Sequence, residues 1–128
     1  MKVVRPMDNK ILVSVKANYM ADQTLPRERY VYSYTITIAN LGEQAAQLLS
    51  RHWLIRDAKN NLQEVQGVGV IGEQPHIAPG ESFTYTSGVV LETETGIMEG
   101  TYQMRADNGD VFDAEIPAFA LVPPHAIH

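Results

Sequence analysis

Apolar and polar side chains alternate residue by residue along several short stretches of this chain. In residues 30–39, one parity holds only large apolar side chains: Tyr30, Tyr32, Tyr34, Ile36 and Ile38. Period-two alternation rich in aromatic and β-branched residues is typical of a strand with one buried face. This stretch is therefore predicted to be a strand whose tyrosines and isoleucines enter the core.

Other stretches predict further strands separated by turn signals. Their ranges are 11–18, 46–56, 62–72, 83–88, 102–107 and 111–121. Asn108-Gly109 predicts a two-residue type I′ hairpin turn, because both central residues of such a turn need φ > 0. Pro117 indicates a bulge or a sheet edge, since proline cannot donate to a strand ladder.

Residues 46–56 are ambiguous. Leucines, Trp53 and Ile55 could line a helix, and residues 44–49 are good helix formers. A strand is favoured because Leu49, Trp53 and Ile55 share one parity and the stretch lies between turn signals. On this interpretation Arg51 starts on the same side as Trp53, while His52 points outward. A cation on the inner side must snorkel, pair, or mark a functional cleft.

Seven or so short strands with no amphipathic helix predict an all-β fold, a two-sheet antiparallel β-sandwich. The length of 128 residues fits one domain, residues 1–128. Residues 1–10 lack periodicity and are expected to be a mobile arm, and residues 123–128 a tail.

Composition narrows the function classes. The chain has no cysteine, which excludes disulfides, thiolate metal sites and thiol nucleophiles. A formal net charge of −5 argues against a nucleic-acid partner. No apolar run approaches the ~18 residues of a membrane helix, so no membrane partner is expected and a cytoplasmic location is predicted.

The string Gly67-Val68-Gly69-Val70-Ile71-Gly72 is a formal G-x-G-x-x-G. In a dinucleotide fold such glycines precede a helix whose N-terminus holds the pyrophosphate. Pro75 and Pro79-Gly80 follow here, so no helix can begin. The string therefore lacks the helix that a dinucleotide-binding fold requires. The favoured interpretation is a glycine-kinked strand at a sandwich corner. A nest of N–H groups that contacts an anion is the weaker alternative.

The histidines show no metal-ligand spacing, and nothing resembles a nucleophile elbow. They stand at His52, His76, His125 and His128. No metal ligand, no cofactor and no catalytic residue is therefore predicted.

Several linked segments carry a family resemblance. They are Leu49–Ile55 (LSRHWLI), Val65–Pro75, Pro79-Gly80-Glu81, Phe83–Gly88, Gly96, Met98, Gly100–Tyr102, Met104, Phe112, Ile116-Pro117 and Phe119–Leu121. Together they resemble the bacterial ApaG proteins, also called CorD, over nearly the whole chain. The resemblance implies a fibronectin type III-like sandwich and a partner-binding module, because similar domains occur in eukaryotic F-box and DNA-polymerase-interacting proteins. It also implies a link to divalent-cation (cobalt, magnesium) homeostasis and to the neighbourhood of diadenosine tetraphosphate hydrolysis, and it supplies no catalytic residues.

These observations predict a non-enzymatic protein-interaction domain whose protein partner is unidentified. Function on such scaffolds usually lies on loops. The candidate binding residues are Gly67, Gly69, Gly72, Glu73 and Gln74, with Arg51 and His52 nearby. The alternative is a binder of, or enzyme acting on, a pyrophosphate-bearing nucleotide through the Gly67–Gly72 loop.

Overall fold

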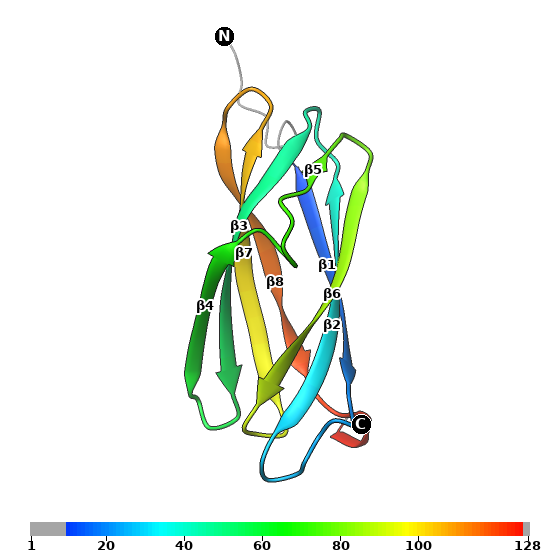
Figure 1. Cartoon of the computed structure of the whole chain (residues 1–128), viewed down its shortest axis with the longest axis vertical. Helices are drawn as coiled ribbons and strands as arrows, with labels where there is room; N and C mark the ends of the chain where they lie inside the picture. Colours follow the sequence, from blue (N-terminus) through cyan, green and yellow to red (C-terminus); the bar gives the residue numbers. More distant parts are fainter. Residues whose placement is uncertain (1–9, 127–128) are drawn as a thin grey trace.

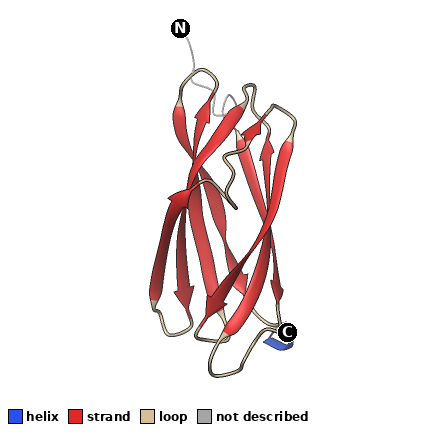
Figure 2. Cartoon of the chain, in the orientation of Figure 1, coloured by secondary structure: helices blue, strands red, loops and turns tan. Residues whose placement is uncertain are grey.

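The protein is described from a computed structural model, which describes residues 10–126 of the chain. Strands make up nearly all of its regular structure, and one three-residue helical turn lies at Pro124–Ala126 (Figures 1 and 2). The strands are β1 (Ile11–Tyr19), β2 (Tyr30–Asn40), β3 (Ala46–Asp57), β4 (Leu62–Val68), β5 (His76–Ile77), β6 (Ser82–Leu91), β7 (Gly96–Ala106) and β8 (Val111–Leu121).

The strands form two antiparallel sheets that face each other. The smaller sheet has the order β1-β2-β6, and the larger has the order β4-β3-β7-β8. The short strand β5 pairs with the beginning of β3 in the larger sheet. The prediction of a two-sheet antiparallel sandwich with a fibronectin type III-like arrangement is confirmed.

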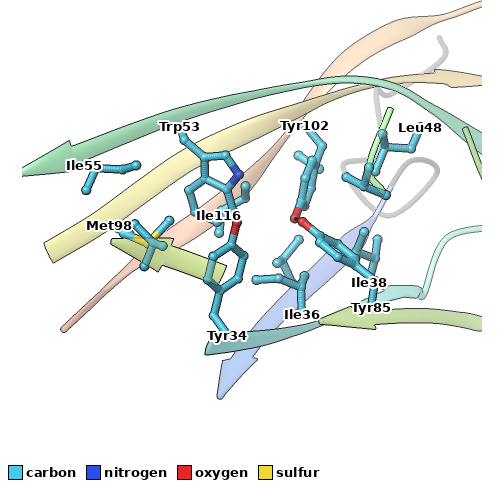
Figure 3. Packing of buried hydrophobic residues seen from close by; sticks show 14 of the residues in the cluster. Tyr34, Ile36, Ile38, Leu48, Trp53, Ile55, Tyr85, Met98, Tyr102 and Ile116 are labelled. Atoms are coloured by element: carbon cyan, nitrogen blue, oxygen red, sulfur yellow. Dashed lines mark hydrogen bonds between the residues drawn. The ribbon is translucent and has the colours of Figure 1, made fainter. Parts of the chain in front are cut away.

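The alternation of residues 30–39 places the core where it was expected. Tyr32, Tyr34, Ile36 and Ile38 are buried, and Tyr30 is half-buried. They pack against inward-facing side chains of the larger sheet, which include Trp53, Met98, Tyr102 and Ile116 (Figure 3). The core is therefore one layer between the two sheets, as in other sandwiches.

One predicted parity is wrong. The register of β3 against β7 shifts between Leu48 and Ser50, which places a β-bulge at Leu49. Because an extra residue reverses the alternation, Leu48 is buried with Trp53 and Ile55, and Leu49 is only half-buried.

The hairpin between β7 and β8 also differs in detail. Gly109 alone of its loop residues has a positive φ, of 96°. The N–H of Gly109 donates to the Ala106 carbonyl, and the N–H of Ala106 donates to the Asp110 carbonyl. The connection is thus a three-residue loop with glycine at its left-handed position, in place of the expected two-residue type I′ turn.

The predictions for Pro117 are confirmed, because β8 is an edge strand and its register shifts opposite Met98–Gly100. The expected tail at 123–128 begins with Pro123, which is buried, and His125 lies 3.2 Å from Glu94. This part of the expected tail therefore packs on the domain. Residues 1–9 of the expected arm and residues 127–128 of the tail lie outside the described residues, and Lys10 is exposed.

The two lateral sides of the sandwich are unlike each other. On one side, β1 of the smaller sheet lies beside β8 of the larger sheet. On the other side are the edge strands β4 and β6, and a surface groove opens between them.

Candidate functional site

The glycine-rich segment leaves β4 and folds inward. Val70 reaches the core, with 1% of its surface exposed. A tight turn follows, because Val70 and Glu73 exchange two backbone hydrogen bonds of 2.8 Å. The central residues of this turn, Ile71 and Gly72, have φ values of 43° and 78°. Residues 67–74 are called the glycine turn below; Figure 1 shows this segment passing between the sheets before β5.

The glycine turn is attached to the bulge in β3. The carbonyl of Leu49 accepts hydrogen bonds from the N–H of Gly69 and from Nε2 of Gln74, both at 2.9 Å. Gly69 has a φ of 64°, and a Cβ built on it would lie 2.3 Å from the Glu73 carbonyl oxygen. Gly69 and Gln74 thus hold the local backbone together.

Arg51 lies on the inner side of β3, the side predicted for it. Its Nη1 donates to the carbonyls of Val68 at 3.2 Å and Gly69 at 2.8 Å. The guanidinium covers Gly67, where an added Cβ would lie 2.7 Å from both Nη1 and Nη2. Gly67 therefore provides the space that Arg51 occupies. Among residues 10–126, no carboxylate forms an ion pair with Arg51.

This geometry gives the nucleotide alternative little support. The N–H groups of Gly69, Val70 and Glu73 all donate to backbone carbonyls. Nη1 of Arg51 already donates to two backbone carbonyls of the turn. In addition, strand β5 follows the turn where an anion-binding fold would have a helix.

His52 lies on the opposite face of β3 from Arg51. Its Nε2 is 2.5 Å from a carboxylate oxygen of Glu64, which belongs to the neighbouring strand β4. The structure therefore brings Arg51 together with the glycine turn and places His52 on the outer surface of the larger sheet. Glu73 is exposed and contributes its backbone to the turn.

Sequence reasoning missed the groove between β4 and β6. Its first part has a volume of about 330 Å³ and is lined by Tyr34, Arg51 and Trp53 on the inside, Gln63 and Val65 of β4, and Ser87–Val90 of β6. A second part, of about 450 Å³, shares Ile55, Gln63 and Val90 with the first. It extends to Glu28, Asp57, Asn61, Leu62, Leu91 and Glu92. We call the two parts together the β4–β6 groove.

Asp57 lines the second part of the β4–β6 groove. Loss of water raises the pKa of Asp57, but hydrogen bonds from the N–H groups of Asn61 and Lys59 and from the Asn61 amide outweigh this effect. With the charge of Lys59 added, the pKa of Asp57 lies below its ordinary value. This end of the groove therefore keeps its negative charge at neutral pH.

Two tyrosine hydroxyls meet in the core behind the groove. Tyr85 of β6 and Tyr102 of β7 are hydrogen-bonded at 2.5 Å (Figure 3). Burial raises the pKa of Tyr85 to about 12, although its hydrogen bond with Tyr102 works in the opposite direction. Burial also raises the pKa of Tyr102. Both hydroxyls are therefore neutral at physiological pH.

We expect stability to fall in alkaline solution. A folded-state pKa above the unfolded value of 10.0 means that the stabilisation is complete below pH 10. It is lost as pH rises from 10 towards the folded pKa of about 12. Urea unfolding at a series of pH values, with tyrosinate absorbance recorded in parallel, measures this loss.

The control is the double variant Tyr85→Phe/Tyr102→Phe, in which the alkaline loss should shrink. At neutral pH each single variant leaves one buried hydroxyl unpaired, which costs about 1–3 kcal/mol. The double variant should cost less than the sum of the two. An unchanged alkaline profile in the double variant would assign the loss to other groups.

In residues 10–126, no three His, Asp or Glu side chains are grouped so that they could hold a metal ion. The same part of the chain contains no helix long and apolar enough to span a membrane.

The fold and the site together define a class of protein. It is a fibronectin type III-like sandwich with a glycine turn and a groove on one lateral side. The family model of the ApaG domain matches residues 21–106. Protein ApaG of Thiobacillus denitrificans is 54% identical over 120 residues, which cover 93% of this chain and 94% of the relative. Protein ApaG of Shewanella baltica is 53% identical over 123 residues, 95% of this chain and 98% of the relative.

Two solved structures are also similar. The crystal structure of structural-genomics target SoR45 has a TM-score of 0.89 and 51% identity, and the match covers 94% of this chain and 92% of that one. A Bordetella pertussis protein described as ApaA has a TM-score of 0.88 and 45% identity, with coverage of 91% and 95%. The chain belongs to the ApaG family.

Proposed function

We propose that this protein is a non-enzymatic protein-interaction domain, and that the glycine turn is part of its binding surface. The observation that carries the proposal is Ile71. Its side chain is 54% exposed, and its φ of 43° lies in the left-handed region. That region costs a residue with a Cβ about 1–2 kcal/mol, and a β-branched side chain suits it especially poorly.

An exposed apolar side chain at a strained position needs a reason other than folding. Glycine or asparagine would be more stable there, and residue 71 contributes little to the core. Val68, on the other side of Gly69, is 74% exposed. The turn is held rigidly by buried Val70 and by the hydrogen bonds to Leu49. A rigid, exposed apolar tip is typical of a protein-binding surface, because little conformational entropy is lost on binding.

The link to cobalt and magnesium homeostasis that the resemblance implies fits the same proposal. No group of three metal-ligating side chains was found among residues 10–126. We propose that the link to cations runs through the protein partner.

Ile71→Asn tests the proposal. Relief of the strained φ should raise the free energy of unfolding by about 1–2 kcal/mol, measured by urea unfolding. Loss of the apolar side chain should at the same time reduce the amount of partner captured from native cells, measured by quantitative mass spectrometry.

The control is Val111→Asn, which removes an equally exposed apolar side chain, 56% exposed, from the far edge of the larger sheet. It should leave capture unchanged. If Ile71→Asn is stabilised and captures the same proteins in the same amounts, the glycine turn is not part of the binding surface.

A further inference from the structure

Strand β6 has a complete row of unpaired backbone groups on its outer edge. The N–H of Asn40 donates to the Glu81 carbonyl, so the antiparallel alternation assigns the groups of residues 83, 85, 87 and 89 to β2. The N–H and C=O groups of Thr84, Thr86, Gly88 and Val90 therefore point away from the sheet. Among residues 10–126, no strand pairs with this edge.

The edge of β6 also lacks the features that usually prevent strand addition. Its ten residues, Ser82–Leu91, include no charged residue and no proline, and the register with β2 has no bulge. Exposed edges normally carry such residues or bulges, or are covered, because a bare edge is a template for another chain.

The other three edges show these features within the described residues. Strand β8 contains Pro117, a bulge and the outward carboxylates Asp113 and Glu115. Strand β1 contains Lys16 and lies beside β8. Strand β4 carries the charged residue Glu64. An unprotected edge is thus particular to β6.

The side chains of an added strand would enter the β4–β6 groove, which has opposite charges at its two ends. Arg51 lines the part next to Ser87 and Gly88 and has no carboxylate partner among residues 10–126. Glu28, Asp57 and Glu92 line the part next to Leu91. Between the two ends the groove offers the apolar side chains of Ile55, Val65 and Val89.

We infer that β6 pairs antiparallel with an extended segment of a protein partner, in which a basic, an apolar and an acidic residue occupy alternate positions. In this register the basic residue lies opposite Leu91, the apolar residue opposite Val89 and the acidic residue opposite Ser87. The basic side chain reaches the carboxylates, and the acidic side chain reaches Arg51. The inference rests on the proposed function, because it names the chemistry of the segment that the domain binds.

A second copy of the chain fits this edge less well. Two β6 strands paired about a twofold axis would place one uncharged strand against another. The second β6 would bring no charged side chain of its own to Arg51 or to the three carboxylates. A segment with charges at both ends satisfies both ends of the groove, which favours a heterologous partner.

The probe is a fluorescein-labelled peptide with the core Lys-Thr-Val-Thr-Glu, flanked by threonines and blocked at both ends. Fluorescence anisotropy should show saturable binding to the wild-type protein. The peptide with the charges exchanged, Glu-Thr-Val-Thr-Lys, should bind the wild-type protein at least about fivefold more weakly than the original peptide. The original peptide should also bind the Arg51→Gln variant at least about fivefold more weakly than it binds the wild-type protein. Equal affinity for the two peptides, or no binding at about millimolar protein, would overturn the inference.

Thr86→Pro separates strand addition from side-chain binding. It removes an outward N–H and leaves the ladder with β2 intact, as is tolerated on an edge strand. Binding should weaken at least about tenfold. Thr86→Val, which keeps the N–H, should bind like the wild type. Equal binding by Thr86→Pro, with circular dichroism showing a folded protein, would contradict pairing at β6.

Hydrogen exchange of the wild-type protein gives a measurement that does not depend on a variant folding. The peptide should slow exchange of the amides of Thr86, Gly88 and Val90 and leave those of β1 unchanged. Sedimentation velocity without peptide should show a monomer; a dimer abolished by Thr86→Pro would assign the edge to a second copy instead. If the peptide does not bind while Ile71→Asn still captures less partner, the inference about β6 is wrong and the proposed function stands.

Discussion

Replacement of Trp53 by alanine should lower the free energy of unfolding by about 3–5 kcal/mol. Only 2% of the Trp53 surface is exposed. Its ring packs edge-on against Tyr34 of the smaller sheet and Tyr102 and Phe119 of the larger sheet, at centroid distances of 5.5, 6.4 and 6.0 Å. The cavity would therefore open between the two sheets, where neither can move in to fill it.

Urea unfolding followed by circular dichroism measures the effect, because Trp53 is the single tryptophan of the chain and the variant has no indole fluorescence. Leu54→Ala is the matched control, since the next residue lies on the outer face of β3 and is half-buried. It should cost clearly less. A near-neutral Trp53→Ala would show that the ring does not belong to the core.

Gly69→Ala should be the most damaging of the substitutions in the glycine turn. A Cβ at φ 64° costs about 1–2 kcal/mol. The same Cβ would lie 2.3 Å from the Glu73 carbonyl oxygen, and forcing the backbone apart adds about 1–3 kcal/mol. The turn would also lose its hydrogen bond to the bulge at Leu49.

Gly72→Ala is the control for the backbone conformation alone. Its φ is 78°, but nothing lies within 4 Å of an added Cβ. It should cost only about 1–2 kcal/mol. Thermal unfolding of the two variants measures the difference. If both lose the same stability, the close approach of Gly69 to Glu73 has no energetic weight.

The fold could be predicted from the sequence because the alternation is local. Each inward side chain of residues 30–39 needs only the pleat of its own strand to reach the core. It was also predictable that no helix follows the formal G-x-G-x-x-G, since two prolines soon after Gly72 leave no room for one. The proposed binding of a partner, the absence of enzymatic activity and the cytoplasmic location remain predictions.

The sequence-based predictions were wrong or incomplete where segments distant in sequence determine the local structure. The bulge at Leu49 is satisfied by Gly69 and Gln74, which lie 20 and 25 residues further along the chain. No count of alternating residues within β3 can reveal partners so far away. Arg51 and His52 are neighbours in sequence, but a strand sends them to opposite faces, and only Arg51 joins the glycine turn.

No sequence pattern indicates the β4–β6 groove, because β4 and β6 come together only through the packing of the two sheets. The uncharged stretch between Glu81 and Glu92 was visible in the sequence. Its meaning depends on β6 being an edge strand, which the sequence pattern does not specify.

The Tyr85–Tyr102 pair has a mechanical consequence for a domain of this design. It joins an edge strand of the smaller sheet to an interior strand of the larger one. If a bound partner pulled on β6, the load would pass through this bond into β7 as well as through the ladder with β2. The two sheets would then resist sliding past each other, and a force applied to the edge strand β6 would be distributed over both sheets.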